Sequence, residues 1–399
     1  MRRHRVVVTA LLALVLLAPT ARPAGASTTW EWMFFDSQAD HISRRQCRVF
    51  YSVDGTGLTT NNFNRLVTAA QAGAADMQTL TGVDTVYAGA WDGLDDMQKA
   101  SLAPIRIYYA EATGPDALSS PWYGDTVRPK DAYGGEIILF AGPGQHTDAH
   151  LANLLRHEWG HQFNLGDTYD IKRNLYYSAS APASAFKHVF ATNTAYQDYS
   201  QRMGDEDQPW GDGDEAGLWT AGGPGRAAGC FKVTRPTHGR FAFRVLKALY
   251  GSTPAGEVAD VARATETYGP VAGASGALDM DGGDVWRNKG KTAFLTDAWT
   301  GLTGSAPTPT KQEQLEDEWD AAGPSPRPTM LASMANSAAA QDYQEVRQEI
   351  SVVFANVLGR MPTAGELSTF TDWLDTHTYT QLADRLFRIE GDARYEPGS

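Results

Sequence analysis

The chain has 399 residues and a formal net charge of −13. Its composition, with 42% hydrophobic and 11% aromatic residues, is typical of a folded globular protein, and its length allows two or three domains. Because polyanions repel an acidic chain, nucleic acid and anionic membrane surfaces are excluded as partners.

The first 26 residues have the pattern of a secretory signal peptide. A basic start precedes an apolar run of 13 residues, 6–18, and residues 24–26 are small enough for a cleavage site. A retained membrane anchor is the alternative, but this run is too short to span a bilayer. We therefore expect a secreted, extracellular protein that makes no membrane contact after removal of residues 1–26.

Signal removal takes away four arginines and no acidic residue, which moves the formal net charge from −13 to −17. Such acidity favours solubility and the binding of cations, including Ca²⁺. The chain has two cysteines, Cys47 and Cys230. In an oxidising compartment they can form a disulfide, and two buried thiols are the alternative.

Five elements are expected before residue 164. Residues 45–53 alternate in the manner of a strand, and residues 62–80 carry apolar side chains at helical spacing. The short apolar runs 105–110 and 136–141 are expected to be strands, and a helix follows from about residue 147. This order predicts an α/β (α+β) fold with a mixed sheet and helices packed on it.

The helix after residue 147 has clear start and core signals. Thr147 or Asp148 can cap its first turn, and Leu151, Leu154 and Leu155 form a stripe that we expect to be buried.

This helix carries the most informative motif of the chain. His157 and His161 are four residues apart, so both imidazoles project from one face and can bind the same Zn²⁺ ion. Glu158 is the candidate catalytic general base, and Asp167 is a candidate third metal ligand. The pattern predicts a zinc hydrolase site; two packed histidines on an ordinary helix are the alternative.

The motif His157-Glu158-x-x-His161-x-x-Asn164-x-x-Asp167 resembles the signature of the metzincin zinc endopeptidases. Its continuation through residues 166–170 is most similar to the immune inhibitor A family, in which Asp replaces the third His ligand. The resemblance implies a metzincin-like mixed twisted sheet with an active-site helix, a Zn²⁺ cofactor and a protein or peptide substrate.

One position departs from this signature, and two others are alternative candidates for the third ligand. Asn164 stands where the clan usually has Gly, at a sharp turn that needs positive φ; Asn enters that region more readily than most residues. Asp170 is the nearest rival to Asp167 as third ligand, and Glu206 would fit zinc proteases whose third ligand lies on a later helix.

The resemblance also implies a methionine beneath the metal and a substrate bound along an edge strand. Met203 is the candidate for that methionine, with an ordinary loop methionine as the alternative. Residues 136–141 are the candidate edge strand, on which main-chain pairing would hold an extended peptide.

We expect the catalytic domain to span residues 27–250, with a long loop over 204–229 and a last helix over 240–250. Residues 251–337 are rich in Gly, Ala, Thr and Pro, and we expect an irregular extension and Pro-rich linker there, with one charged helical piece. Within it, residues 279–284 have the carboxylate density of a calcium loop, although a solvated turn is favoured.

The last segment, residues 338–399, is expected to be a small bundle of three helices. A capping box of Thr363 and Glu366 begins the second helix. The LGR-x-P…L…W pattern that begins at Leu358 resembles a small helical domain of unknown function that is appended to secreted and surface bacterial proteins, and it implies contact with the cell surface or wall. The competing function is therefore a non-catalytic secreted zinc-containing protein that binds cell wall or glycans.

Overall fold

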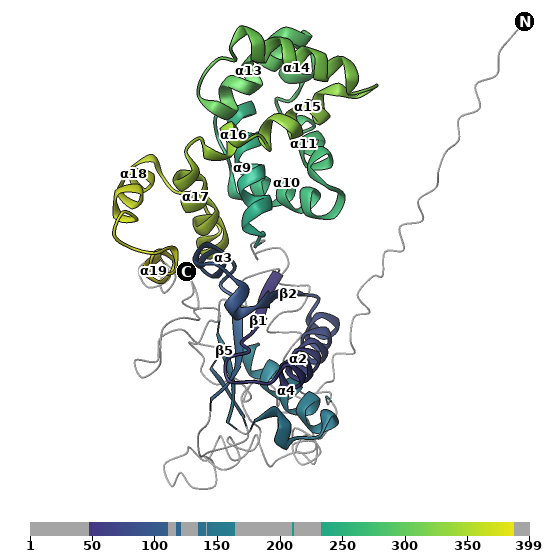
Figure 1. Ribbon diagram of the computed structural model, residues 1–399, viewed down its shortest axis with the longest axis vertical. Helices are drawn as coiled ribbons and strands as arrows, with labels where there is room; N and C mark the ends of the chain where they lie inside the picture. The colour runs from purple at the N-terminus through teal and green to yellow at the C-terminus, as the bar shows by residue number, and fades with distance from the viewer. Residues whose placement is uncertain are drawn as a thin grey trace, which may run out of the picture.

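The computed structural model describes residues 48–110, 117–120, 135–140, 142–163, 210 and 233–386. Figure 1 shows the described elements in three groups: an α/β unit at the N-terminal end, a group of helices above it, and α17 to α19 beside both.

A five-stranded sheet forms the centre of the α/β unit. Its strands are β1 (Arg48–Val53), β2 (Asp84–Ala90), β3 (Ile105–Tyr109), β4 (Ala117–Ser120) and β5 (Glu136–Leu139), arranged in the order β2-β1-β3-β5-β4. All neighbouring pairs are parallel except β4 and β5, which are antiparallel. The expected α/β class with a mixed sheet is therefore confirmed.

The edge of this sheet differs from our expectation. Residues 136–141 were expected to form the edge strand, but β5 pairs with β3 on one side and with β4 on the other. Ala117 lies opposite Leu139, and Ser120 lies opposite Glu136. Because both sides of β5 are hydrogen-bonded, the terminal strand of the described sheet on this side is β4, which was not predicted.

Helices cover both faces of the sheet. The helices of this unit are α2 (Thr60–Thr81), η2 (Trp91–Gly93), α3 (Asp96–Leu102), η3 (Pro143–Gln145) and α4 (Asp148–Gln162). The apolar side chains of α2 and α4 share a buried core with alternate residues of β1, namely Val49, Tyr51 and Val53. Phe50 points to the opposite face, where it packs with Leu102 of α3.

Residues 251–337 are helical, so the expected irregular extension was wrong. With α9 (Pro236–Tyr250), these residues form a helical unit that shares one buried core. Its other helices are α10 (Ala255–Tyr268), α11 (Pro270–Leu278), α12 (Asp284–Arg287), α13 (Lys291–Thr303), α14 (Pro309–Ala321), α15 (Pro326–Ala335) and α16 (Ala338–Asp342).

Proline explains much of this difference. Pro236, Pro270, Pro309 and Pro326 each occupy the first turn of a helix, where the fixed φ and missing N–H are tolerated. The Pro-rich stretches therefore mark helix starts instead of a flexible linker. The charged piece that was expected to be helical corresponds to α14.

The acidic stretch at residues 279–284 is partly neutralised within the helical unit. Arg287 places Nη1 2.7 Å from Asp279 Oδ1 and Nη2 2.6 Å from Asp284 Oδ1. The two carboxylates therefore share a guanidinium at the surface, in agreement with the favoured reading as a solvated turn.

The C-terminal group consists of α17 (Glu345–Leu358), α18 (Ala364–Trp373) and α19 (Tyr379–Leu386). The predicted capping box is present, since Thr363 Oγ1 accepts from Glu366 N and Glu366 Oε2 accepts from Thr363 N. This bundle shares its core with α3 of the α/β unit, which contributes Met97, Ala100 and the following Ala103. It is thus packed against the rest of the molecule.

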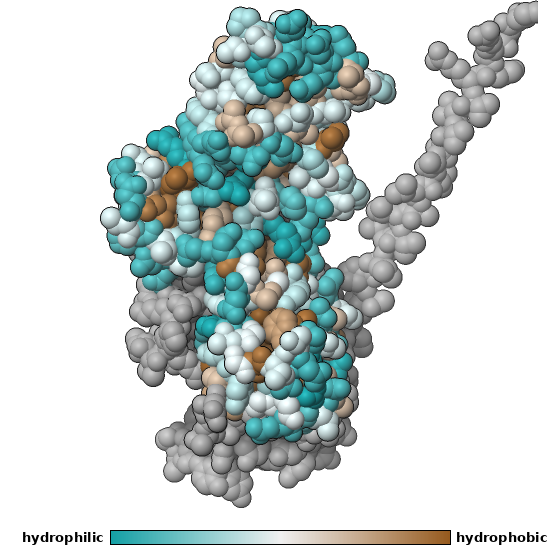
Figure 2. Space-filling view, viewed as in Figure 1, coloured by the Kyte–Doolittle hydropathy of each residue, from teal (hydrophilic) through white to brown (hydrophobic). Residues whose placement is uncertain are grey.

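The molecular surface is mainly polar on the face shown in Figure 2, where hydrophobic side chains lie in small separate groups. Among the described residues, Tyr268 and Val285 are the most exposed large hydrophobic side chains, at 79% and 65%. No helix in the described ranges combines the length and apolar character that crossing a membrane requires.

Candidate metal centre

The helix α4 begins where the sequence predicted. Thr147 is its N-cap, and its hydroxyl accepts a hydrogen bond from His150 N at 3.2 Å. Asp148 lies in the first turn, where a negative charge interacts favourably with the helix dipole. Leu151, Leu154 and Leu155 are buried, as expected.

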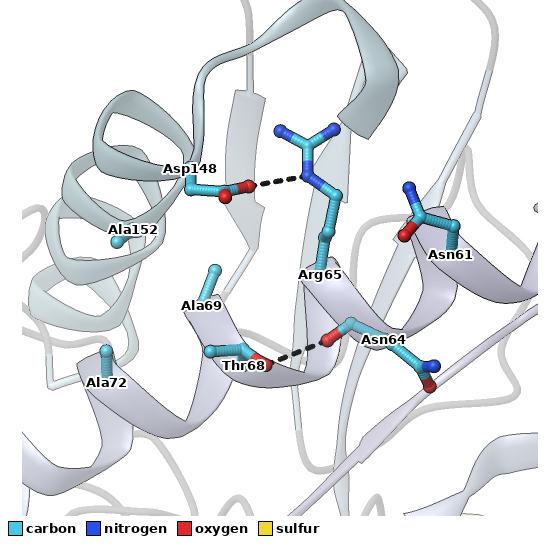
Figure 3. A pocket seen from close by; sticks show the side chains of 8 residues that line it. All are labelled: Asn61, Asn64, Arg65, Thr68, Ala69, Ala72, Asp148 and Ala152. Atoms are coloured by element: carbon cyan, nitrogen blue, oxygen red, sulfur yellow. Dashed lines mark hydrogen bonds and ion pairs between the residues drawn. The ribbon is translucent and has the colours of Figure 1, made fainter.

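An arginine from α2 fixes this end of α4 (Figure 3). Arg65 places Nε 2.6 Å from Asp148 Oδ1, and its two terminal nitrogens donate to the carbonyls of Pro143 and His146 at 2.8 and 2.5 Å. The pocket in Figure 3 lies beside this interaction, between α2 and α4. The contacts of Arg65 therefore position the helix without taking part in the candidate site.

A fully buried indole anchors the middle of α4 to α2. Trp159 is 0% exposed, and its Nε1 donates to the carbonyl oxygen of Ala70 at 3.2 Å. Its ring meets Tyr51 of β1 edge to face, with the centroids 5.3 Å apart. Gly73 leaves the space that the indole fills, because a Cβ there would lie 2.2 Å from Trp159 Cδ1.

The end of α4 is attached to the sheet. Gln162 is fully buried, and its Nε2 donates to the carbonyl oxygen of Glu136 in β5 at 2.9 Å. Phe163, at the end of the helix, is also 0% exposed. Contacts at both ends and in the middle thus hold α4 against α2 and β5.

The three motif residues come together on this anchored helix. His157, Glu158 and His161 each offer a ligand atom, and these atoms lie within 4.8 Å of one another. The three residues are 8%, 4% and 4% exposed. The imidazole planes are perpendicular, with ring centroids 4.6 Å apart and the two Nε2 atoms 3.0 Å apart.

This geometry fits a metal ion. Two nitrogens bound to Zn²⁺ at about 2.0–2.1 Å in tetrahedral geometry lie roughly 3.3 Å from each other. The observed Nε2–Nε2 separation of 3.0 Å is within a few tenths of that value. The buried His157–Glu158–His161 cluster can therefore hold a metal ion between the two imidazoles.

Several predicted site residues lie outside the described part of the chain. They are the third-ligand candidate Asp167 with its rivals Asp170 and Glu206, the turn residue Asn164, the methionine candidate Met203, and the cysteines Cys47 and Cys230. The described residues therefore place two candidate ligands and the candidate base, and the roles of the others stay predictions.

The structure also identifies supporting residues that the sequence reading missed. Trp159, Gly73 and Gln162 position the helix that carries the candidate ligands. A glycine inside a helical pattern is the one available signal, since such a glycine often marks close packing. Nothing in the sequence around Gln162 indicates its bond to β5.

Comparisons with known proteins add no family to this description. Protein-family models, curated protein sequences and solved structures were all searched, and none matches the chain.

Proposed function

We propose that the protein is a secreted zinc-dependent endopeptidase. The observation that carries the proposal is the buried pair of imidazoles with Glu158 beside it on one helix. His157 and His161 would hold the metal through their Nε2 atoms, which already face each other. The signal pattern at residues 1–26 supports secretion of the chain.

Bound Zn²⁺ would supply an activated water molecule and polarise the scissile carbonyl group. In the proposed mechanism Glu158 accepts the proton of that water during attack and returns it to the leaving amine. Its position next to His157 in the sequence, with a ligand atom in the same cluster, keeps the carboxylate close to the reacting atoms. Because the three side chains are buried, solvent water competes less for their ligand atoms.

The sheet edge supports a peptide as the substrate. Strand β4 pairs with β5 on one side and is the terminal strand of the described sheet. An extended peptide could add to its other side through main-chain hydrogen bonds, which provide affinity with little sequence preference. This assigns to Ala117–Ser120 the role that was expected of residues 136–141.

The decisive experiment combines metal analysis with peptide cleavage. Glu158→Gln should retain zinc, because both imidazoles remain, but should lose hydrolysis of a broad peptide library because it cannot accept a proton. Glu313→Gln, at an exposed position on α14, is the matched control and should behave as wild type. Full cleavage activity in Glu158→Gln would rule out the mechanism.

The same experiment distinguishes the competing function. Zinc at full stoichiometry without any chelator-sensitive cleavage in the wild type would favour a non-catalytic protein that binds cell wall or glycans.

A second variant tests the third ligand. Asp167→Ala should lower the zinc content, since it removes one of three proposed protein ligands. If the zinc content is unchanged, Asp170→Ala and Glu206→Ala become the variants to measure.

A further inference from the structure

A pocket with several polar side chains lies in the helical unit, which is separate from α4 (Figure 1). It has a volume of about 260 Å³ and is bounded by α9, α10, the start of α11, the end of α15 and α16. Its polar lining includes His238, Arg240, Arg244, Asn336 and Gln341. No carboxylate side chain of the described residues lines the pocket.

Arg244 is the central residue of this pocket. It is only 8% exposed. Its Nε donates to the carbonyl oxygen of Ala335 at 2.9 Å, and its Nη1 donates to Gln348 Oε1 at 3.0 Å. Both acceptors are neutral, and within the described ranges no carboxylate forms an ion pair with this guanidinium. A positive charge is therefore buried without a counter-charge, which is costly.

The neighbouring cation increases this cost. Arg240 is itself paired, with Nη1 2.6 Å from Glu349 Oε1 and 3.7 Å from Glu345 Oε1. Burial, and then the positive charge of Arg240, nevertheless lower the pKa of Arg244 to about 10. The ion pairs of Glu345 and Glu349 within the described residues are with Arg240, and neither carboxylate pairs with Arg244.

Two further features of the lining favour a negative ligand. His238 Nδ1 is buried and has no hydrogen-bond partner among the described residues, so one tautomer of the ring can donate to a ligand. Helix α11 begins beside the pocket at Pro270 and has no side-chain cap. The positive end of its dipole therefore points to the same region.

We propose that this pocket binds a small oxyanion, either a carboxylate or inorganic phosphate. The Arg244 guanidinium would supply the missing ion pair through Nη2, and His238 would supply a second donor. The volume of about 260 Å³ is sufficient for a small oxyanion. Since five helices line the pocket, the bound anion would stabilise the helical unit.

Calorimetric titration of the full mature chain tests this proposal. The probes are inorganic phosphate and succinate, each compared with sodium chloride at the same ionic strength. Saturable binding of one or both probes is expected, together with a higher Tm. Binding of phosphate alone or succinate alone identifies which oxyanion source the pocket accepts.

The variants connect binding to the pocket. Arg244→Gln should weaken binding by at least about tenfold, because a charge-assisted hydrogen bond contributes more than a neutral one. Arg347→Gln removes the same charge from an exposed position of α17 and should leave binding unchanged. Absence of saturable binding in the wild type, or an equal loss in both variants, would overturn the proposal.

A second variant avoids the structural hydrogen bonds of Arg244. Gln341→Glu places a carboxylate in the pocket and removes the hydrogen bond from Gln341 Nε2 to the carbonyl oxygen of Asn336. Because the new negative charge repels an anion, the variant should abolish phosphate and succinate binding. Gln314→Glu makes the same change at an exposed position on α14, away from the pocket lining. Undiminished anion binding in Gln341→Glu would show that the anion binds elsewhere and would also overturn the proposal.

Discussion

A methyl group at Gly73 of α2 would clash with Trp159 of α4, the helix that carries the candidate metal site. A Cβ at Gly73 would lie 2.2 Å from Trp159 Cδ1 and 3.0 Å from Nε1. Carbon atoms make favourable contact at about 3.5 Å or more, so the indole or α2 would have to move by roughly 1.3 Å. The indole is held by its bond to Ala70 and has no exposed surface. Gly73→Ala should therefore displace α4.

The expected cost follows from these contacts. Overpacking of a core costs about 1–3 kcal/mol, and loss of the bond from Trp159 to Ala70 adds about 1 kcal/mol. Alanine recovers roughly 0.5–1 kcal/mol of helix propensity. Gly73→Ala should thus destabilise the protein by about 1–3 kcal/mol. Gly256→Ala is the control, because that helical glycine has no atom near its Cβ position and the change should be neutral or stabilising.

Urea unfolding of the two variants, with zinc affinity as a second measurement, tests this reasoning. Trp159 lies two residues from His157 and two from His161, about 200° around the helix, so moving its ring should tilt the opposite face that carries the imidazoles. Zinc affinity should fall in Gly73→Ala, and Trp159→Leu in the same chain should relieve part of the cost. Equal stability of the Gly73→Ala and Gly256→Ala proteins would refute the argument.

Three other predictions concern the metal and two ion pairs. Chelation should lower the Tm, because a ligand at 1,000 times its Kd contributes about 4 kcal/mol; an unchanged Tm in differential scanning calorimetry would contradict a resident metal. Asp54→Asn should cost about 3 kcal/mol in urea unfolding, since Arg106 Nη2 lies 2.5 Å from the 2%-exposed Asp54 carboxylate and would lose its counter-charge; a cost no larger than that of a surface substitution would show the pair to be dispensable. Hydrogen bonds from Arg360 lower the pKa of Glu366 from 4.5 to about 2, so its stabilisation is complete above pH 4.5 and is lost as the pH falls toward 2. Glu366→Gln should remove that pH dependence. An acid unfolding curve identical to that of the wild type would contradict the assignment to Glu366.

The α/β unit was largely predictable because its elements carry strong local signals. Thr147 and the three leucines of α4 mark a capped amphipathic helix, and the spacing of His157 and His161 forces their imidazoles onto one face. Strand β2 was missed because its residues, DTVYAGA, are all half-buried and include glycine, so they show no alternation of apolar and polar side chains. Strand β4 is only four residues long and is defined by its pairing with β5.

The helical unit was missed for a different reason. Residues 251–337 are poor in large apolar side chains, and α11 in particular is built from small residues such as Gly273 and Ala274. Close packing of small residues depends on tertiary contacts that periodicity does not reveal. The pocket around Arg244 could not be predicted from the sequence for the same reason, since its lining residues come from helices that are distant in the sequence.

The junction between α3 and α19 has a consequence for the order of folding. The Asp96 carboxylate accepts hydrogen bonds from Tyr379 N and from Thr380 Oγ1, both at 2.6 Å, across 283 or more positions in the chain. Closing a loop of that length costs about 5 kcal/mol in chain entropy. Because translation begins at the N-terminus, α3 emerges long before α19 and keeps its Met97 side of the core uncovered until synthesis is nearly complete. A chain truncated before residue 379 would leave that surface open to aggregation or proteolysis even though every residue of the candidate metal site is present.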